Sequence, residues 1–309
     1  MYMPDWNNKD EVLGEVTRWG FSLQYASDEL RNDPVIVLSA VGENGLALEF
    51  ATDEMKNTPS IVVAAFNNRW DSLKYASPYI LSDKTFTMSL VEKDGRCLEF
   101  ISDELRSDTE VVLCAIQQRG DIIRILPPKM KNNIKIAMCA VKNDGNALYH
   151  LSDKFKSNRS LVSEAVKQNG RAIQHVSEEL RGDYDIAMLA VKRTGRALYH
   201  VSKELQNNPF IVSEAVKQNG SALQYTNIRL RNEYSIVIEA VKQDGFSLEY
   251  ASDDLKNNRY IVLEAMTTDG IVIQFASERL RGMDDIMSEA MSRNKWAGHY
   301  KSNLKIRVI

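Results

Sequence analysis

Apolar residues along this chain gather in short clusters that return every 25 residues. After Asn208-Pro209 they have the spacing of one helix face, at Ile211, Val212, Ala215 and Val216. An asparagine N-cap followed by proline in the first turn is a typical helix start. The pattern therefore predicts an amphipathic helix of about ten residues between Asn208 and Asn219. The same start signal stands at equivalent positions, at Asp33, Asp108, Asn158, Asp183 and Asn258.

Glycine follows each predicted helix at one position of the repeat, at Gly20, Gly45, Gly95, Gly120, Gly145, Gly170, Gly195, Gly220, Gly245 and Gly270. Because glycine adopts left-handed backbone conformations at no steric cost, we expect these residues to end each helix with a positive φ. Trp70 takes this place in one unit and Lys295 in the last. Since a bulky residue disfavours positive φ, we expect the turn at Arg69-Trp70 to be remodelled.

A second, shorter apolar cluster lies between each glycine and the next predicted helix, as at Ala197, Leu198, Val201 and Leu205. It predicts a helix of one to two turns. Ser202 is expected to cap one further turn, and the same role is expected at Ser27, Ser102 and Ser177. Neither half of the unit can bury its apolar face alone, so stability is expected to come from stacking of the units.

A fixed period without insertions is typical of a solenoid. We expect an all-α fold, a right-handed α-solenoid of tandem 25-residue helical repeats. Residues 20–294 span 275 positions, which is eleven repeats of 25. Residues 1–19 and 295–309 are interpreted as half-repeat caps at the two ends.

Composition limits the function classes. The chain has no apolar run of the roughly 18 residues that a membrane helix needs and no signal-peptide pattern, so a cytoplasmic chain is expected. Its three cysteines, Cys97, Cys114 and Cys139, are expected to be free thiols. The net charge is −3 and the pI is about 5.9, which argues against a general nucleic-acid binder.

Three successive units carry histidine where most units carry an aromatic residue, at His150, His175 and His200. Residues one repeat apart are separated by about 9 Å, so we expect no metal site and no other cofactor. Two interpretations stay open. The imidazoles replace partly buried aromatic rings, or they form a recognition strip with Tyr149, Gln174 and Tyr199 whose binding depends on pH.

Two basic rows follow the repeat. One contains Lys142, Lys167, Lys192, Lys217 and Lys242, joined near the turn by Arg171, Arg193 and Arg196. Because Glu164, Glu214 and Glu239 precede three of these lysines by three residues, the row is expected to be largely self-compensated. The other row contains Arg31, Lys56, Arg106, Lys131, Lys156, Arg181, Arg231, Lys256 and Arg281. It is expected to pair with neighbouring carboxylates or carbonyl groups.

The repeat consensus is G-x-A-L-x-Y/F/H-A/V-S-x-E-L-R/K-N-D/N followed by I-V-x-E-A-V-K-Q-N-G. It resembles the helical repeat family called "domain of unknown function 4116", from about Lys9 to Leu304. The resemblance brings no activity, substrate or catalytic residue. It implies an interaction role, including action on a host cell after delivery into it, because members occur in intracellular bacteria, protists and large DNA viruses.

No catalytic residue is predicted, because GxxxxGK, GxGxxG, HExxH, GxSxG and CxxC patterns are all absent. We expect a non-enzymatic scaffold that binds a protein partner, with acidic segments favoured as ligands. The predicted partner-binding residues are Tyr149, His150, Lys167, Arg171, His175, Lys192, Arg196, Tyr199 and His200. A nucleic-acid-binding repeat array and an enzyme with a shallow, unrecognised site stay open as alternatives.

Overall fold

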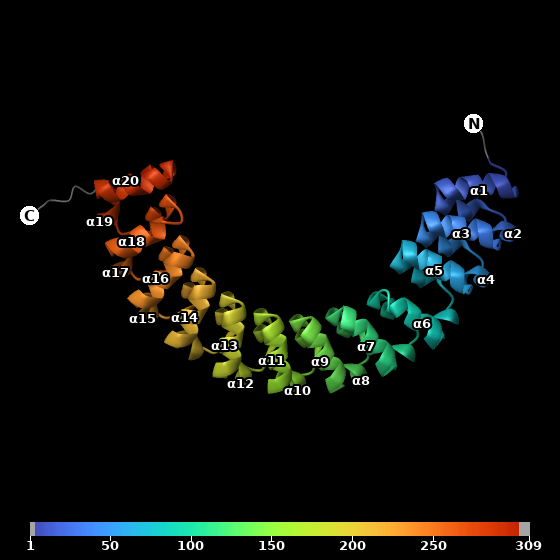
Figure 1. Cartoon of the computed structure of the whole chain (residues 1–309), viewed down its shortest axis with the longest axis horizontal. Helices are drawn as coiled ribbons and strands as arrows, with labels where there is room; N and C mark the ends of the chain where they lie inside the picture. Colours follow the sequence, from blue (N-terminus) through green and yellow to red (C-terminus); the bar gives the residue numbers. More distant parts are fainter. Residues whose placement is uncertain (1–3, 303–309) are drawn as a thin grey trace, which may run out of the picture. The chain divides into compact units, whose positions relative to one another are not determined.

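The computed structural model describes residues 4–302 and divides into two compact units, Met1–Asn143 and Asp144–Ile309. Helices are the only regular elements within the described residues, which confirms the all-α prediction (Figure 1). Each repeat contains a long α-helix, a 3₁₀ helix and a short helical turn. Of the predicted end caps, residues 1–3 and 303–309 lie outside the described residues.

Unit 1 contains all three kinds of element. Its long helices are α1 (Lys9–Arg18), α3 (Pro34–Glu43), α5 (Pro59–Asn68), α6 (Lys84–Val91), α7 (Thr109–Gln118) and α9 (Ile134–Asn143). The 3₁₀ helices that follow are η1 (Gly20–Tyr25), η2 (Gly45–Phe50), η3 (Trp70–Tyr75), η5 (Gly95–Glu99) and η7 (Gly120–Ile125). The short turns are α2 (Asp28–Arg31), α4 (Asp53–Lys56), η4 (Ile80–Ser82), η6 (Leu105–Ser107) and α8 (Pro128–Lys131).

Unit 2 repeats this order. Its long helices are α11 (Arg159–Gln168), α13 (Tyr184–Arg193), α14 (Pro209–Gln218), α16 (Tyr234–Gln243), α18 (Arg259–Met266) and α20 (Asp284–Arg293). Its 3₁₀ helices are η8 (Gly145–His150), η9 (Gly170–His175), η10 (Gly195–His200), η12 (Gly220–Tyr225), η13 (Gly245–Tyr250), η14 (Gly270–Phe275) and η15 (Lys295–Tyr300). The short turns are α10 (Asp153–Lys156), α12 (Glu178–Arg181), η11 (Leu205–Asn207), α15 (Ile228–Arg231), α17 (Asp253–Lys256) and α19 (Glu278–Arg281).

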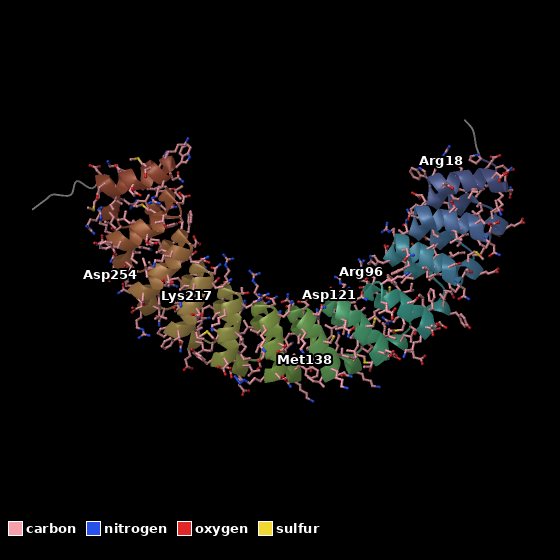
Figure 2. All side chains as sticks on the ribbon, viewed as in Figure 1. Arg18, Arg96, Asp121, Met138, Lys217 and Asp254 are labelled. Carbon is pink, nitrogen blue, oxygen red and sulfur yellow. The ribbon has the colours of Figure 1, made fainter. Side chains whose placement is uncertain are left out.

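The core lies between a row of long helices and a row of 3₁₀ helices. Within unit 2, α11, α13, α14 and α16 pack side by side, and η8, η9, η10 and η12 form the second row against them (Figure 1). The predicted apolar face is confirmed, since Ile211, Val212, Ala215 and Val216 are fully buried. Lys217 lies on α14 and Asp254 on α17 of this unit (Figure 2). We call the edge where long helices end and 3₁₀ helices begin the turn edge.

Side-chain caps begin the long helices as the sequence predicts. The Asn208 side chain accepts hydrogen bonds from the N–H groups of Phe210 and Ile211, at 3.0 and 3.3 Å. Equivalent caps occur at Asp33, Asp108, Asn158, Asp183 and Asn258. The predicted serine caps are confirmed at Ser27, Ser102 and Ser202. The prediction is wrong at Ser177, whose buried hydroxyl makes no hydrogen bond.

The prediction of left-handed glycines is wrong, because no described residue has a positive φ. Glycine is required for a different reason. A Cβ built on Gly45 would lie 2.3 Å from the carbonyl oxygen of Ala65 on the next long helix. The same 2.3 Å approach joins Gly195 to Ala215 in unit 2. The backbones of adjacent repeats therefore touch at the glycine, and any side chain there would force them apart.

A side-chain amide completes this junction. The Oδ1 atom of Asn68, at the end of α5, accepts a hydrogen bond from the Gly45 N–H at 2.8 Å. Its Nδ2 group donates to the carbonyl oxygens of Gly42 and Glu43, at 2.9 and 3.2 Å. Gln118 bridges η5 and α6 in the same way. This amide clamp satisfies carbonyl groups at a helix end that would otherwise lack partners.

Trp70 affects the packing of the next long helix, α6, and not the turn in which it lies. The backbone of Arg69 has φ −147° and ψ 115°, close to φ −142° and ψ 110° at Asn44, so the prediction of a remodelled turn is wrong. Because this turn needs no positive φ, tryptophan fits it. Its Cβ instead occupies the site of close approach to the next long helix. α6 packs less closely on α5 than α5 packs on α3.

The cysteines are free thiols, as predicted. Cys97 is buried in η5, and burial raises the pKa of its thiol to about 12. Cys114 and Cys139 are half-buried on α7 and α9, and burial raises their pKa values too.

Candidate partner-binding surface

The 3₁₀ helices of unit 2 place two tyrosines in solvent. Tyr149 in η8 and Tyr199 in η10 are 60% and 59% exposed. Each directly precedes a half-buried histidine, His150 or His200. In a six-residue 3₁₀ helix the alanine and leucine of the consensus point into the core, so the next two residues reach the surface.

Ring contacts join the predicted residues into two clusters. Tyr149 lies 5.0 Å from His150 and 5.0 Å from His175, between ring centroids. Tyr199 lies 4.9 Å from His200 and 5.1 Å from Tyr225. Gln174 occupies the tyrosine position of the intervening unit, so no tyrosine bridges His175 to His200. These distances fall in the range of favourable aromatic pairs, which hold each tyrosine in place.

Burial lowers the pKa values of His175 and His200 below the ordinary histidine value. For His175 the charge of Lys156 and then the neighbouring His200 and His150 add to this effect. For His200 the additional causes are Arg181 and Arg171. Both imidazoles are therefore uncharged at neutral pH, and they behave as aromatic rings in the stack.

Stability is expected to fall as pH is lowered from about 7.5 to about 5.5, on either side of the ordinary histidine pKa. The unfolded chain binds protons to His175 and His200 over this range more readily than the folded chain, because their folded-state pKa values are lowered. The variant His175→Tyr/His200→Tyr lacks this contribution to the pH dependence of stability. Thermal unfolding followed by circular dichroism should show a smaller pH-dependent drop in Tm for the variant. An equal drop in both proteins would contradict the prediction.

The lysine row lies at the ends of the long helices, on the turn edge. Lys167 contacts Glu164 at 2.9 Å and Lys217 contacts Glu214 at 3.1 Å. Lys242 and Glu239 form a looser pair at 3.8 Å. The predicted self-compensation is confirmed for these three lysines, and exposed pairs of this kind contribute little to stability.

Lys192 differs from Lys167 because Leu189 stands three residues before it, where its neighbours carry glutamate. No described contact joins Lys167 or Lys192 to the tyrosine clusters. Arg171 and Arg196 are exposed at the second position of η9 and η10. Arg171 lies close enough to His200 to lower its pKa, so the structure relates this arginine, rather than Lys167 or Lys192, to the rings.

The second basic row pairs as predicted at several positions. Arg31 contacts Asp28, Arg106 contacts Asp103, and Lys156 lies 3.6 Å from Asp153. Lys131 donates to the Arg124 carbonyl oxygen at 2.8 Å, and Arg231 donates to that of Gln224. At these positions the row thus pairs with carboxylates and carbonyl groups of its own repeat.

Tyr225 is a member of the second cluster that sequence reasoning left outside the site. Its position five residues after Gly220 matches that of the histidines, so alignment of the repeats could have identified Tyr225. The contact with Tyr199 comes from the following unit and required the tertiary structure.

Among residues 4–302, no group of three or more His, Cys, Asp or Glu side chains is arranged to hold a metal ion. No helix in the same range is both long and apolar enough to cross a membrane.

The stacked units and their exposed 3₁₀ face define a helical tandem-repeat protein. The family model described as "Domain of unknown function (DUF4116)" matches residues 16–53, 36–81, 83–131, 133–181, 158–206, 183–231, 208–256 and 258–304. The chain belongs to this family. No curated protein and no solved structure matches it.

Proposed function

We propose that the chain is a non-catalytic scaffold that binds a protein partner through the exposed tyrosines of unit 2. The observation that supports this most strongly is the bracing of Tyr149 and Tyr199. Each exposes more than half of its side chain while its ring packs against two other rings. A tyrosine held in this way loses little conformational entropy on binding.

The neighbouring charges favour an acidic partner. Arg171 and Arg196 stand exposed on the 3₁₀ helices that carry His175 and His200. Tyrosine and arginine are the residues that most often dominate the binding energy of protein interfaces. Because these imidazoles are uncharged at neutral pH, the positive charge near the rings comes from Lys156, Arg181 and Arg171.

Capture of partners from a lysate tests this proposal. Action on a host protein, which the family resemblance implies, is part of the proposal, so the lysate is eukaryotic. The tagged full chain is compared with the variant Tyr149→Ala/His175→Ala/Arg171→Glu/Arg196→Glu. We expect the wild type to retain a partner that the variant loses, because truncation of Tyr149 together with reversal of the two arginine charges should weaken binding by about tenfold or more.

A charge-matched control separates a specific surface from general electrostatics. Lys154→Glu/Arg229→Glu reverses two exposed charges on the short turns α10 and α15. This control is expected to retain the partner. Circular dichroism establishes that both variants are folded. Equal retention by the site variant, or capture of no partner by the wild type, would refute the proposal.

A further inference from the structure

The junction between α5 and α6 in unit 1 lacks two features of the adjacent junctions, the glycine of close approach and the amide clamp. Trp70 replaces the glycine at which adjacent backbones touch. Lys93 stands 23 residues later, where Asn68 and Gln118 supply the amide of the clamp in the adjacent repeats. A lysine side chain has no acceptor for the Trp70 N–H. α6 packs less closely on α5 than α5 packs on α3, and two hollows lie along these helices.

An apolar hollow lies at the N-terminal ends of these helices. It has a volume of about 530 Å³ and is lined by Asn57, Pro59, Tyr79, Ile80, Asp83, Thr85, Phe86 and Ser89. Phe86 is only half-buried, whereas Ile61 and Val111 at the equivalent positions of α5 and α7 are fully buried. Tyr79 is 78% exposed at the rim. The hollow is thus an unfilled core position that is open to solvent.

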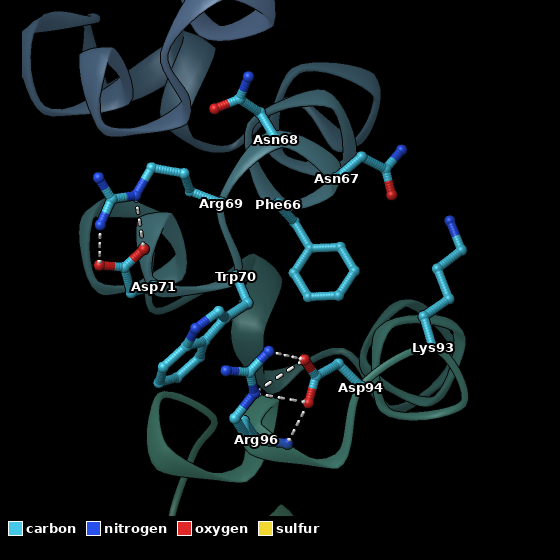
Figure 3. Close-up of a pocket in the computed structure, with 9 residues that line it drawn as sticks. All are labelled: Phe66, Asn67, Asn68, Arg69, Trp70, Asp71, Lys93, Asp94 and Arg96. Atoms are coloured by element: carbon cyan, nitrogen blue, oxygen red, sulfur yellow. Dashed lines mark hydrogen bonds and ion pairs between the residues drawn. The ribbon is translucent and has the colours of Figure 1, made fainter.

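A polar hollow of about 400 Å³ lies at the other end of the same helices, on the turn edge (Figure 3). The Arg96 guanidinium lies 4.3 Å from the Trp70 ring and pairs with Asp94 at 2.5 Å. Arg69 pairs with Asp71 at 3.1 Å. These contacts fix the walls of the hollow.

Lys93 is the unbalanced charge of this hollow. The lining contains three cations, Arg69, Lys93 and Arg96, and two carboxylates, so one positive charge is in surplus. Both carboxylates are already held by arginines. Lys93 is exposed and has no carboxylate partner among the described residues. An anionic group of a ligand would balance the positive charge of this polar hollow.

We propose that the opening between α5 and α6 binds an extended peptide segment of a partner protein, with an apolar side chain in the hollow at Phe86 and a carboxylate at Lys93. These two residues are seven positions apart, which is about 10 Å along a helix axis. An extended chain covers that distance in about three residues. The ligand is therefore a segment whose apolar and acidic residues are about three positions apart.

The probes are short fluorescein-labelled peptides with one phenylalanine and one glutamate in a glycine and serine background. The set varies the separation of the two residues from adjacent to about five positions. Fluorescence anisotropy with the full-length chain should show saturable binding that is strongest at a separation of about three. Replacement of the glutamate by glutamine should weaken it about tenfold, as loss of a charged contact implies.

Variants of exposed residues test where on the chain the peptides bind. Lys93→Glu is expected to weaken binding by about tenfold or more, and Tyr79→Ala by severalfold, while Lys129→Glu in the same unit should leave it unchanged. The site variant of unit 2 used above should bind the peptides normally, so the two proposals fail separately. No saturation by any peptide up to about 1 mM would overturn the inference. So would binding that ignores the glutamate or survives both Lys93→Glu and Tyr79→Ala.

Discussion

Replacing Gly45 by alanine is expected to lower the free energy of unfolding by about 3 kcal/mol. The added Cβ would lie 2.3 Å from the Ala65 carbonyl oxygen and 3.2 Å from the Arg69 backbone nitrogen. Neither backbone atom can move without displacing α5, so the junction between the units must open. In a stack stabilised by contacts between neighbours, the cost extends to the flanking repeats. Urea unfolding followed by circular dichroism measures the effect as an earlier transition.

Gly42, three residues earlier in α3, provides the matched control. It has no atom within 4 Å of an added Cβ, so alanine fits there. Since alanine favours helix over glycine, Gly42→Ala should raise the stability by up to about 1 kcal/mol. Opposite effects of the same substitution would establish contact between repeats as the reason for glycine. Similar effects at both positions would refute it.

Replacing Gln118 by alanine is expected to cost about 2 kcal/mol, which is typical when partly buried polar groups lose their partners. The amide accepts a hydrogen bond from the Gly95 N–H at 3.0 Å. It donates to the carbonyl oxygens of Val91 and Glu92, at 2.8 and 2.9 Å. Hydrogen exchange should therefore become faster in η5 and at the end of α6.

The neighbouring Gln117 separates this effect from loss of helix propensity. Its side chain is exposed and makes no described hydrogen bond. Gln117→Ala is expected to change the stability by less than about 0.5 kcal/mol. If Gln118→Ala proves equally neutral, the clamp contributes nothing to the junction.

Much of the fold could be predicted because its signals are local. Asn208 caps its helix through bonds to N–H groups two and three residues away, and the apolar spacing at Ile211 and Val212 places one face in the core. Ser177 shows the limit, because the same residue type at the same position makes no capping bond. Whether such a serine forms a cap depends on the position of its hydroxyl group in the folded chain, which cannot be inferred from the sequence.

The candidate site was predicted only in part. Tyr149 and Tyr199 were expected on one strip with the histidines, and the structure joins them through ring contacts. Their partners come from the same and the following repeat, so the clusters also depend on how the units stack. The choice of these residues as a partner-binding surface stays a prediction.

The amino-acid sequence by itself determined the period, the helix starts, the apolar faces and the family, because each depends on residues close together in the chain. Only the tertiary structure decided what the glycines do and where Trp70 acts. Gly45 and Trp70 follow turns of nearly the same backbone conformation, so no local rule distinguishes them. The difference between the two positions lies in their contact with the next long helix, about 20 residues later in the chain. A carbonyl group of that helix faces only a hydrogen atom at glycine, and a side chain at tryptophan. Contact between repeats is a property of the stack, and it appears only when neighbouring units are placed together.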